Sequence, residues 1–193
     1  MPIACIVEGH GEVSAVPELI RRIGSQLDPP WYPIVERPIR VPGSRLRQAA
    51  EFERAVELAA ARAGQGGGIL ILLDGEDDCP AELGPELRGR IARDDIEVGV
   101  VLAKFEYEAW FLAAAESIRG HRGLADDLEA PADPENVRGA KEWLRDRMEG
   151  SRTYSETLDQ VALTAVMDLE SARRADSFDK CYREVARLVT SAA

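Results

Sequence analysis

A short apolar segment that runs into a group of acids constrains the fold of this chain more than any other stretch. The segment Ile69–Asp78 reads ILILLDGEDD, and two glycines, Gly67 and Gly68, precede it. A continuous apolar run with these boundaries predicts a fully buried central strand of a parallel sheet. Such a strand delivers the residues that follow it to the carboxyl edge of the sheet, where open α/β folds bind their ligands.

The acids that follow this strand are Asp74, Glu76, Asp77 and Asp78. Carboxylates packed this closely repel one another unless a cation joins them, and hard oxygen ligands suit Mg²⁺ or Mn²⁺. The alternative is a solvated acidic loop, because such loops are common. The segment alone leaves both interpretations open.

Strands and helices are expected to alternate over the first part of the chain, which predicts an α/β fold with a parallel sheet of about four strands between helices. The other expected strands are Pro2–Val7, Trp31–Val41 and Ile96–Ala103, and the helices between them are Val13–Leu27, Arg45–Ala63 and 81–92. Pro33 and Pro38 make the second strand irregular or an edge strand. We therefore expect an α/β core over residues 1–119.

The remainder, residues 120–193, is expected to be a helical extension that packs on the core, so that the chain forms a single globular unit. It begins with a polar loop over Gly120–Pro134. Short helices are predicted at Asn136–Arg147, Glu156–Ala165, Leu169–Arg174 and Ser177–Val189.

Charge and composition limit the function classes. The net charge of −11 argues against a free-standing nucleic-acid binder, because phosphate contacts need Lys and Arg. Cys5, Cys79 and Cys181 form no CxxC pattern, which argues against zinc and a disulfide framework. No apolar run approaches the ~20 residues of a membrane span. With no signal peptide expected at the start, these features favour the cytoplasm and no membrane partner.

Acids and a lysine are also expected at the ends of the other strands. Glu8 follows the first strand, Glu12 lies one helical turn later, and Lys104 and Glu108 follow the strand Ile96–Ala103. Because parallel strands end at one edge of a sheet, we expect these side chains to lie near Asp74. Two divalent ions held by such carboxylates can promote phosphodiester hydrolysis.

Two weaker patterns have competing interpretations. The string GHGEVS resembles a dinucleotide fingerprint, but Ser14 replaces its third glycine and two acids in the turn would repel a pyrophosphate. Arg40, Arg45 and Arg47 form one basic cluster, which predicts either a solvated helix start or a rim that contacts phosphates.

The constellation resembles the Toprim fold, which has Glu-Gly after its first strand and Asp-x-Asp after a later one. More closely, the chain resembles a bacterial family of Toprim-like proteins of unknown function and is similar to the nuclease domains of overcoming-lysogenization-defect proteins. The stretches that carry the resemblance are VEGHGEVSAVPELIRRI at Val7–Ile23, ILLDGEDDCPAEL at Ile71–Leu83, VVLAKFEYEAWFLAAAESIRG at Val100–Gly120, RGAKEWL at Arg138–Leu144, YSETLDQ at Tyr154–Gln160 and SFDKCYRE at Ser177–Glu184.

The resemblance implies a Rossmann-like sheet and a nuclease that uses two Mg²⁺ or Mn²⁺ ions. It implies that Glu8, Glu12, Asp74 and Glu108 hold the metal ions. Glu76 and Asp78 of the acidic segment are further candidate ligands, and Glu8 and Glu12 are also candidates for the general base. Lys104 is the first candidate for the assisting lysine, although Lys141 and Lys180 lie in family-like stretches. Lys141, with the three arginines, is also a candidate for phosphate contact. The implied partners are nucleic acid, with DNA favoured over RNA, and an ATPase of an anti-phage system; self-association is left open.

The chain departs from Asp-x-Asp, because it has Asp74-Gly75-Glu76. Glutamate keeps the charge but adds one methylene, while metal-site geometry must hold to within ~0.5 Å. Two other functions therefore stay open. One is a non-catalytic acidic partner or regulatory subunit of an ATPase, and the other is a phosphatase with Asp74 as nucleophile.

Overall fold

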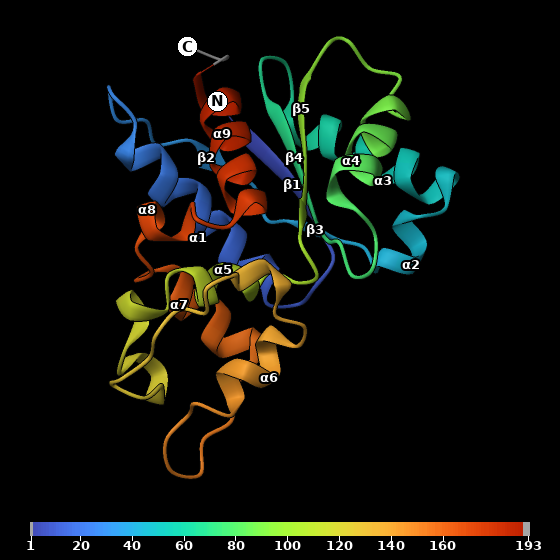
Figure 1. The fold of residues 1–193 in the computed structure, drawn as a ribbon. Coiled ribbons are helices and arrows are strands. Elements are labelled where there is room, and N and C mark those ends of the chain that lie inside the picture. Colours follow the sequence, from blue (N-terminus) through green and yellow to red (C-terminus); the bar gives the residue numbers. More distant parts are fainter. Residues whose placement is uncertain (1, 191–193) are drawn as a thin grey trace.

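The computed structural model of the protein, which describes residues 2–190, contains a five-stranded parallel sheet (Figure 1). The strands are β1 (Pro2–Val7), β2 (Ile34–Val35), β3 (Ile39–Arg40), β4 (Gly68–Asp74) and β5 (Glu97–Ala103). Their order is β2-β1-β4-β5, and β3 also pairs with β1. The predicted α/β fold with a parallel sheet is confirmed, and the apolar run before Asp74 is its central strand β4.

Side chains that alternate along each strand divide the core into two layers. Ile3 and Cys5 of β1 belong to one hydrophobic cluster, whereas Ala4 and Ile6 belong to the other, as the two-residue period of a strand requires. The helices α3 (Ala49–Ala63) and α4 (Pro80–Gly89) cover one face, and α1 (Glu12–Gln26) and α9 (Asp176–Thr190) cover the other. Both faces of the sheet are therefore buried, which explains why β4 is apolar throughout.

The expected strand Trp31–Val41 exists as two short strands, β2 and β3. Both pair with β1, and Pro38 lies between them. Because proline has no N–H group to donate, it interrupts the ladder, as expected for an irregular edge strand. This division is the reason that the sheet has five strands where the sequence predicted about four. The short helix α2 (Gly43–Leu46) follows β3.

The C-terminal part is helical; α9 covers the predicted helix Ser177–Val189, whereas the helices at 136–147 and 169–174 are shorter than predicted. The elements between β5 and α9 are α5 (Ala109–Ala113), α6 (Ala140–Arg145), α7 (Val161–Thr164), α8 (Leu169–Ala172), 3₁₀-helices at Ala115–Ile118, His121–Gly123 and Pro134–Asn136, and a π-helix at Glu156–Gln160. The expected helix 136–147 begins only at α6, because Gly139 before it is left-handed with φ of 74°. Buried residues of this part, such as Leu144 and Leu163, share one hydrophobic cluster with α1 and β1.

The register of the sheet aligns the strand ends that carry the predicted site. Val7 of β1 pairs with Leu72, and Asp74 at the end of β4 pairs with Ala103 at the end of β5. The helices α5, α6 and α7 gather beyond this end of the sheet (Figure 1). Within residues 2–190, no helix combines the length and apolar character that a bilayer crossing requires.

Candidate functional site

Four carboxylates converge at the carboxyl edge of the sheet, and we call them the acidic cluster: Glu8, Glu12, Asp74 and Glu108. Glu8 follows β1, Glu12 begins α1, Asp74 ends β4 and Glu108 immediately precedes α5. The side chains of Glu12 and Glu108 are 3% and 0% exposed. Burial, and then the charges of Glu12 and Glu108, raise the pKa of Asp74 well above its usual range. The chain has thus brought like charges together where water screens them weakly.

Glu12 organises the turn between β1 and α1. Its Oε2 atom accepts hydrogen bonds from the backbone N–H groups of Glu8 at 3.0 Å and Gly9 at 3.1 Å. These bonds favour the ionised form, but burial outweighs them and raises the pKa of Glu12 to about 7. Glu12 is therefore held in place by the turn, with a pKa raised by burial.

The loops after β4 and β5 are joined to each other. Asp74 Oδ1 accepts a hydrogen bond from Tyr107 N at 2.9 Å, and Glu76 N donates to Phe105 O at 2.9 Å. Glu76 and Phe105 have positive φ angles of 48° and 62°, which side-chain-bearing residues adopt only when their surroundings require it. These contacts place Asp74 and Glu108 beside each other.

Glu108 is the most enclosed member of the acidic cluster. Its Oε1 atom accepts hydrogen bonds from Tyr154 Oη at 2.8 Å and Gln160 Nε2 at 3.2 Å. Its Oε2 atom is buried and finds no hydrogen-bond partner among the described residues. Burial raises the pKa of Glu108 to about 7, although Lys141 and Tyr154 act in the opposite direction. A buried oxygen without a partner is costly, so this atom favours a proton or a cation.

Lys141 is the amine that the structure brings to the acidic cluster. Its Nζ lies 2.9 Å from Glu156 Oε1, 3.5 Å from Glu106 Oε2 and 3.8 Å from Glu108 Oε2. Glu106 also accepts hydrogen bonds from Ala140 N and Lys141 N, which fixes the start of α6. Burial alone would lower the pKa of Lys141, but the negative charges of Glu108 and the other carboxylates have the larger effect and raise it. Lys141 is therefore a fixed positive charge.

The acidic cluster fits a hard divalent cation in its donor chemistry but is not arranged as a finished metal site. Across residues 2–190, no three His, Cys, Asp or Glu side chains already stand where they could hold a metal ion together. Several carboxylate oxygens accept hydrogen bonds from the protein, as described for Glu12, Asp74 and Glu108. Within the acidic cluster, Glu108 Oε2 is buried without a hydrogen-bond partner among the described residues, and Oε1 of the adjacent Gln160 is buried and unpaired as well. Metal binding would therefore require these carboxylates to turn toward a shared ion.

A comparison with protein families identifies this chain. A family model described as a domain of unknown function, DUF4276, matches residues 7–186. The chain belongs to the DUF4276 family. No curated protein matches it, and no solved structure matches it. Membership in DUF4276 covers the whole site, from Glu8 to Gln160, but assigns it no chemistry.

Other predicted site residues of this DUF4276 chain lie beside the acidic cluster rather than in it. The side chain of Glu76 is 64% exposed and lies 3.5 Å from Arg47, which also pairs with Asp78. Asp77 is more exposed still and pairs with Arg138 at 2.6 Å. The acids after Asp74 therefore form ion pairs at the surface.

The remaining predicted basic residues have separate partners. Lys104 Nζ donates to Asn136 Oδ1 at 2.9 Å and joins no carboxylate of the acidic cluster. Arg40 donates to the backbone oxygen of Glu8 at 3.3 Å, whereas Arg45 pairs with Glu51 at 2.9 Å. Of the predicted arginines, Arg40 and Arg47 flank the acidic cluster.

Sequence reasoning did not assign a role to Tyr154, Glu156 or Gln160, although all three contact Glu108 or Lys141. They belong to the stretch YSETLDQ, which carried part of the family resemblance. The sequence predicts a helix from Glu156, and the structure forms a π-helix at Glu156–Gln160, but no strand end places this stretch at the carboxyl edge of the sheet. A π-helix turn often occurs at functional sites, but no sequence pattern predicts it here.

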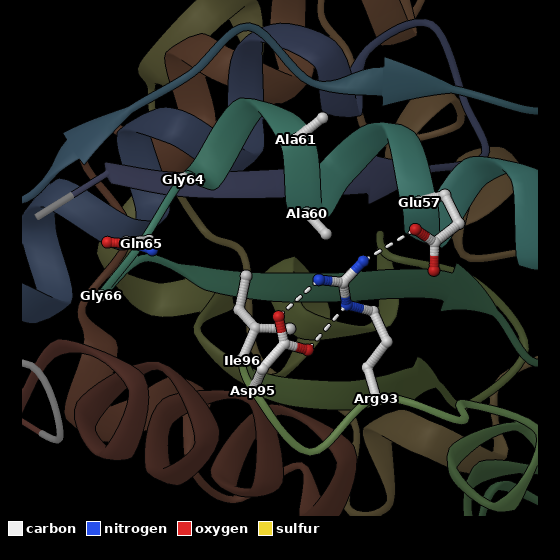
Figure 2. A pocket seen from close by; sticks show the side chains of 9 residues that line it. All are labelled: Glu57, Ala60, Ala61, Gly64, Gln65, Gly66, Arg93, Asp95 and Ile96. Atoms are coloured by element: carbon white, nitrogen blue, oxygen red, sulfur yellow. Dashed lines mark hydrogen bonds and ion pairs between the residues drawn. The ribbon is translucent and has the colours of Figure 1, made fainter.

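A hollow lies at the opposite end of the sheet, beside the Gly64–Gly66 turn that precedes β4 (Figure 2). Arg93 is the cation in its lining, and its guanidinium already bonds Asp95 at 2.9 Å and Glu57 at 2.7 Å. Because Arg93 is already paired with both acids of the lining, the hollow offers no free cation for an anionic ligand.

Proposed function

We propose that this DUF4276 protein is a divalent-metal-dependent hydrolase that cleaves phosphodiester bonds of nucleic acid at the acidic cluster. The observation that carries the proposal is the buried Glu108 Oε2 atom, which has no hydrogen-bond partner among the described residues, in a cluster where the charges of Glu12 and Glu108 raise the pKa of Asp74. Buried like charges with an unused acceptor suit a cation. The resemblance to Toprim nucleases supports the same reaction class, with Mg²⁺ or Mn²⁺ as the ion.

The chain's own residues have distinct roles in this proposal. Glu12, Asp74 and Glu108 would hold the metal, which when bound supplies Lewis-acid activation of water and of the phosphoryl oxygen. Lys141 provides a fixed positive charge at the same site. It takes the role for which Lys104 was the first candidate, because Lys104 is bonded to Asn136.

Glu8 is the best-placed general base. Its side chain is only partly buried, unlike those of Glu12 and Glu108. Burial and the negative charge of Glu76 raise the pKa of Glu8, although the hydrogen bond from the backbone N–H of Gly43 lowers it. In the hydrolysis, the water oxygen bonds to phosphorus and Glu8 accepts the proton of that water. The bond from phosphorus to one ester oxygen breaks, and this oxygen takes a proton from solvent.

The test is calorimetric titration of Mn²⁺, followed by incubation of the same samples with DNA. Asp74→Asn keeps the shape of the side chain and removes its charge, and it is expected to abolish both the heat of binding and the cleavage. Asp77→Asn is the matched control from the same loop, since Asp77 is exposed and bonded to Arg138. Cleavage that persists in Asp74→Asn would refute the site.

One observation favours a second function, a non-catalytic acidic partner of an ATPase. Lys141 already supplies a cation to Glu106, Glu108 and Glu156, so the site has internal charge compensation without a metal. The net charge of −11 suits a basic partner surface. This function predicts that the wild-type protein gives no heat with Mn²⁺ and cuts no DNA.

A further inference from the structure

A small cavity of about 250 Å³ opens directly beside the acidic cluster, between α2 and α4. Glu8 and Asp74 form one wall, so the cavity and the proposed reaction centre share two residues. Arg47 and Arg90 line it as well, and we call it the arginine pocket. Neither Arg90 nor the cavity has a role in the function proposed above.

The arginine pocket has an apolar floor. Leu46, Leu73 and Leu87 line it, and their exposed fractions are only 1%, 6% and 1%. A concave, mostly apolar lining with a few polar groups is the usual character of a small-molecule site. The face of a nucleobase can pack on such a floor, because unstacked bases in enzyme pockets are held between aromatic or apolar side chains.

The two arginines form a fixed pair at this cavity. Arg90 Nη1 donates to the backbone oxygen of Arg47 at 3.2 Å, which ties α4 to the end of α2. Arg47 pairs with Asp78 and Glu76, and Arg90 pairs with Glu86; these three carboxylate side chains are 44%, 64% and 58% exposed. Exposed ion pairs of this kind contribute only about 0–1 kcal/mol. A phosphate, which guanidinium groups bind in a bidentate manner, can replace these carboxylates.

The size of the cavity favours an unpaired nucleotide over a base within a duplex. Its volume of about 250 Å³ lies below the ~300–1,000 Å³ of ordinary ligand pockets, so it holds one nucleotide unit rather than a helix. A paired base in a duplex is stacked and must be extruded before it can enter such a pocket, at a cost of a few kcal/mol. An unpaired strand requires no extrusion.

We propose that the arginine pocket holds one unpaired nucleotide next to the phosphate at the acidic cluster, so that single-stranded nucleic acid is the substrate class. Its base packs on the leucine floor, and a neighbouring phosphate binds Arg47 and Arg90. This inference rests on the proposed function, because it places the reacting phosphate at Asp74 and Glu8.

The experiment measures fluorescence anisotropy of a labelled oligo(dT) strand of about 12 nucleotides, and of its duplex with oligo(dA), in Mn²⁺ before cleavage accumulates. The wild-type protein is expected to bind the strand at least about tenfold more tightly than the duplex. Arg90→Gln is expected to weaken strand binding about tenfold, because it removes one charged donor. Arg88→Gln makes the same change two residues away on α4, at an exposed residue outside the cavity, and is expected to change little.

A second variant tests the cavity itself. Leu83 lines the cavity and is partly buried. Leu83→Trp is expected to fill the arginine pocket and prevent binding of the single strand, while the heat of Mn²⁺ binding is unchanged. Equal affinity for strand and duplex, equal weakening by Arg90→Gln and Arg88→Gln, or no strand binding overturns the inference. If the heat of Mn²⁺ binding persists in any of these cases, the proposed function remains intact. If the wild-type protein gives no heat of Mn²⁺ binding, both the proposed function and this inference are refuted.

Discussion

Replacing Glu108 by glutamine is expected to stabilise the protein at alkaline pH and to have little effect at acidic pH. Burial raises the pKa of Glu108 from 4.5 to about 7, so the folded protein holds a proton there that the unfolded chain has released. Between these two values the folded state binds more protons, and its stability therefore falls as the pH rises. Glutamine keeps the shape of the side chain and cannot ionise.

The magnitude follows from the two pKa values. A tenfold change in proton affinity corresponds to about 1.4 kcal/mol, so ionised Glu108 lowers the free energy of unfolding by about 3 kcal/mol at pH 8. At pH 5 most of this penalty is absent, because the folded-state carboxyl is protonated. The advantage of Glu108→Gln over the wild type is thus expected to grow by about 2–3 kcal/mol between pH 5 and pH 8.

Thermal unfolding in the presence of a chelator at both pH values measures this difference. For a chain of this length, about 1 kcal/mol corresponds to about 2–4 °C in Tm, so the predicted growth is readily resolved. Glu53→Gln is the matched control, since Glu53 is an exposed glutamate on α3. If Glu108→Gln changes Tm by the same amount at both pH values, ionisation of Glu108 does not destabilise the folded protein and the reasoning is wrong.

Three further predictions concern the same region. The affinity for Mn²⁺ is expected to rise steeply between pH 6 and pH 8 in calorimetry, because Glu12 and Glu108 lose their protons over that interval. Tyr154→Phe removes the hydroxyl that stabilises ionised Glu108, and is expected to weaken Mn²⁺ binding several-fold at pH 7 but little at pH 9. Gly11→Ala would drive a methyl group into Gln160, and is expected to lower the free energy of unfolding by about 1–3 kcal/mol in urea titrations.

The periodicity of the sequence was sufficient to predict the sheet. The apolar run before Asp74 proved to be the central strand, with Leu70 and Ile71 fully buried, because only a strand covered on both faces tolerates continuous apolar residues. The alternation of strands and helices predicted parallel pairing, and parallel strands end at one edge. The proximity of Glu8, Asp74 and Glu108 follows from this local information.

Contacts between distant parts of the chain were not predictable in the same way. Lys104 lies nearest the strand end in sequence, yet it is bonded to Asn136, while Lys141 reaches the acidic cluster from α6. Glu76 lies two residues after Asp74, yet its left-handed backbone directs it to the surface and to Arg47. Neither outcome is encoded in spacing, because each depends on how a separate element packs.

The chain's local pattern therefore specifies the scaffold and the acids that its strand ends carry, since propensity and hydrophobic period act over a few residues. The packing of the C-terminal helices brings Lys141 to the acidic cluster and buries Glu108. The packing of α2 near α4 forms the arginine pocket beside Asp74. These features arise where segments far apart in sequence meet, and their energies come from desolvation and charge proximity that exist only in the folded protein.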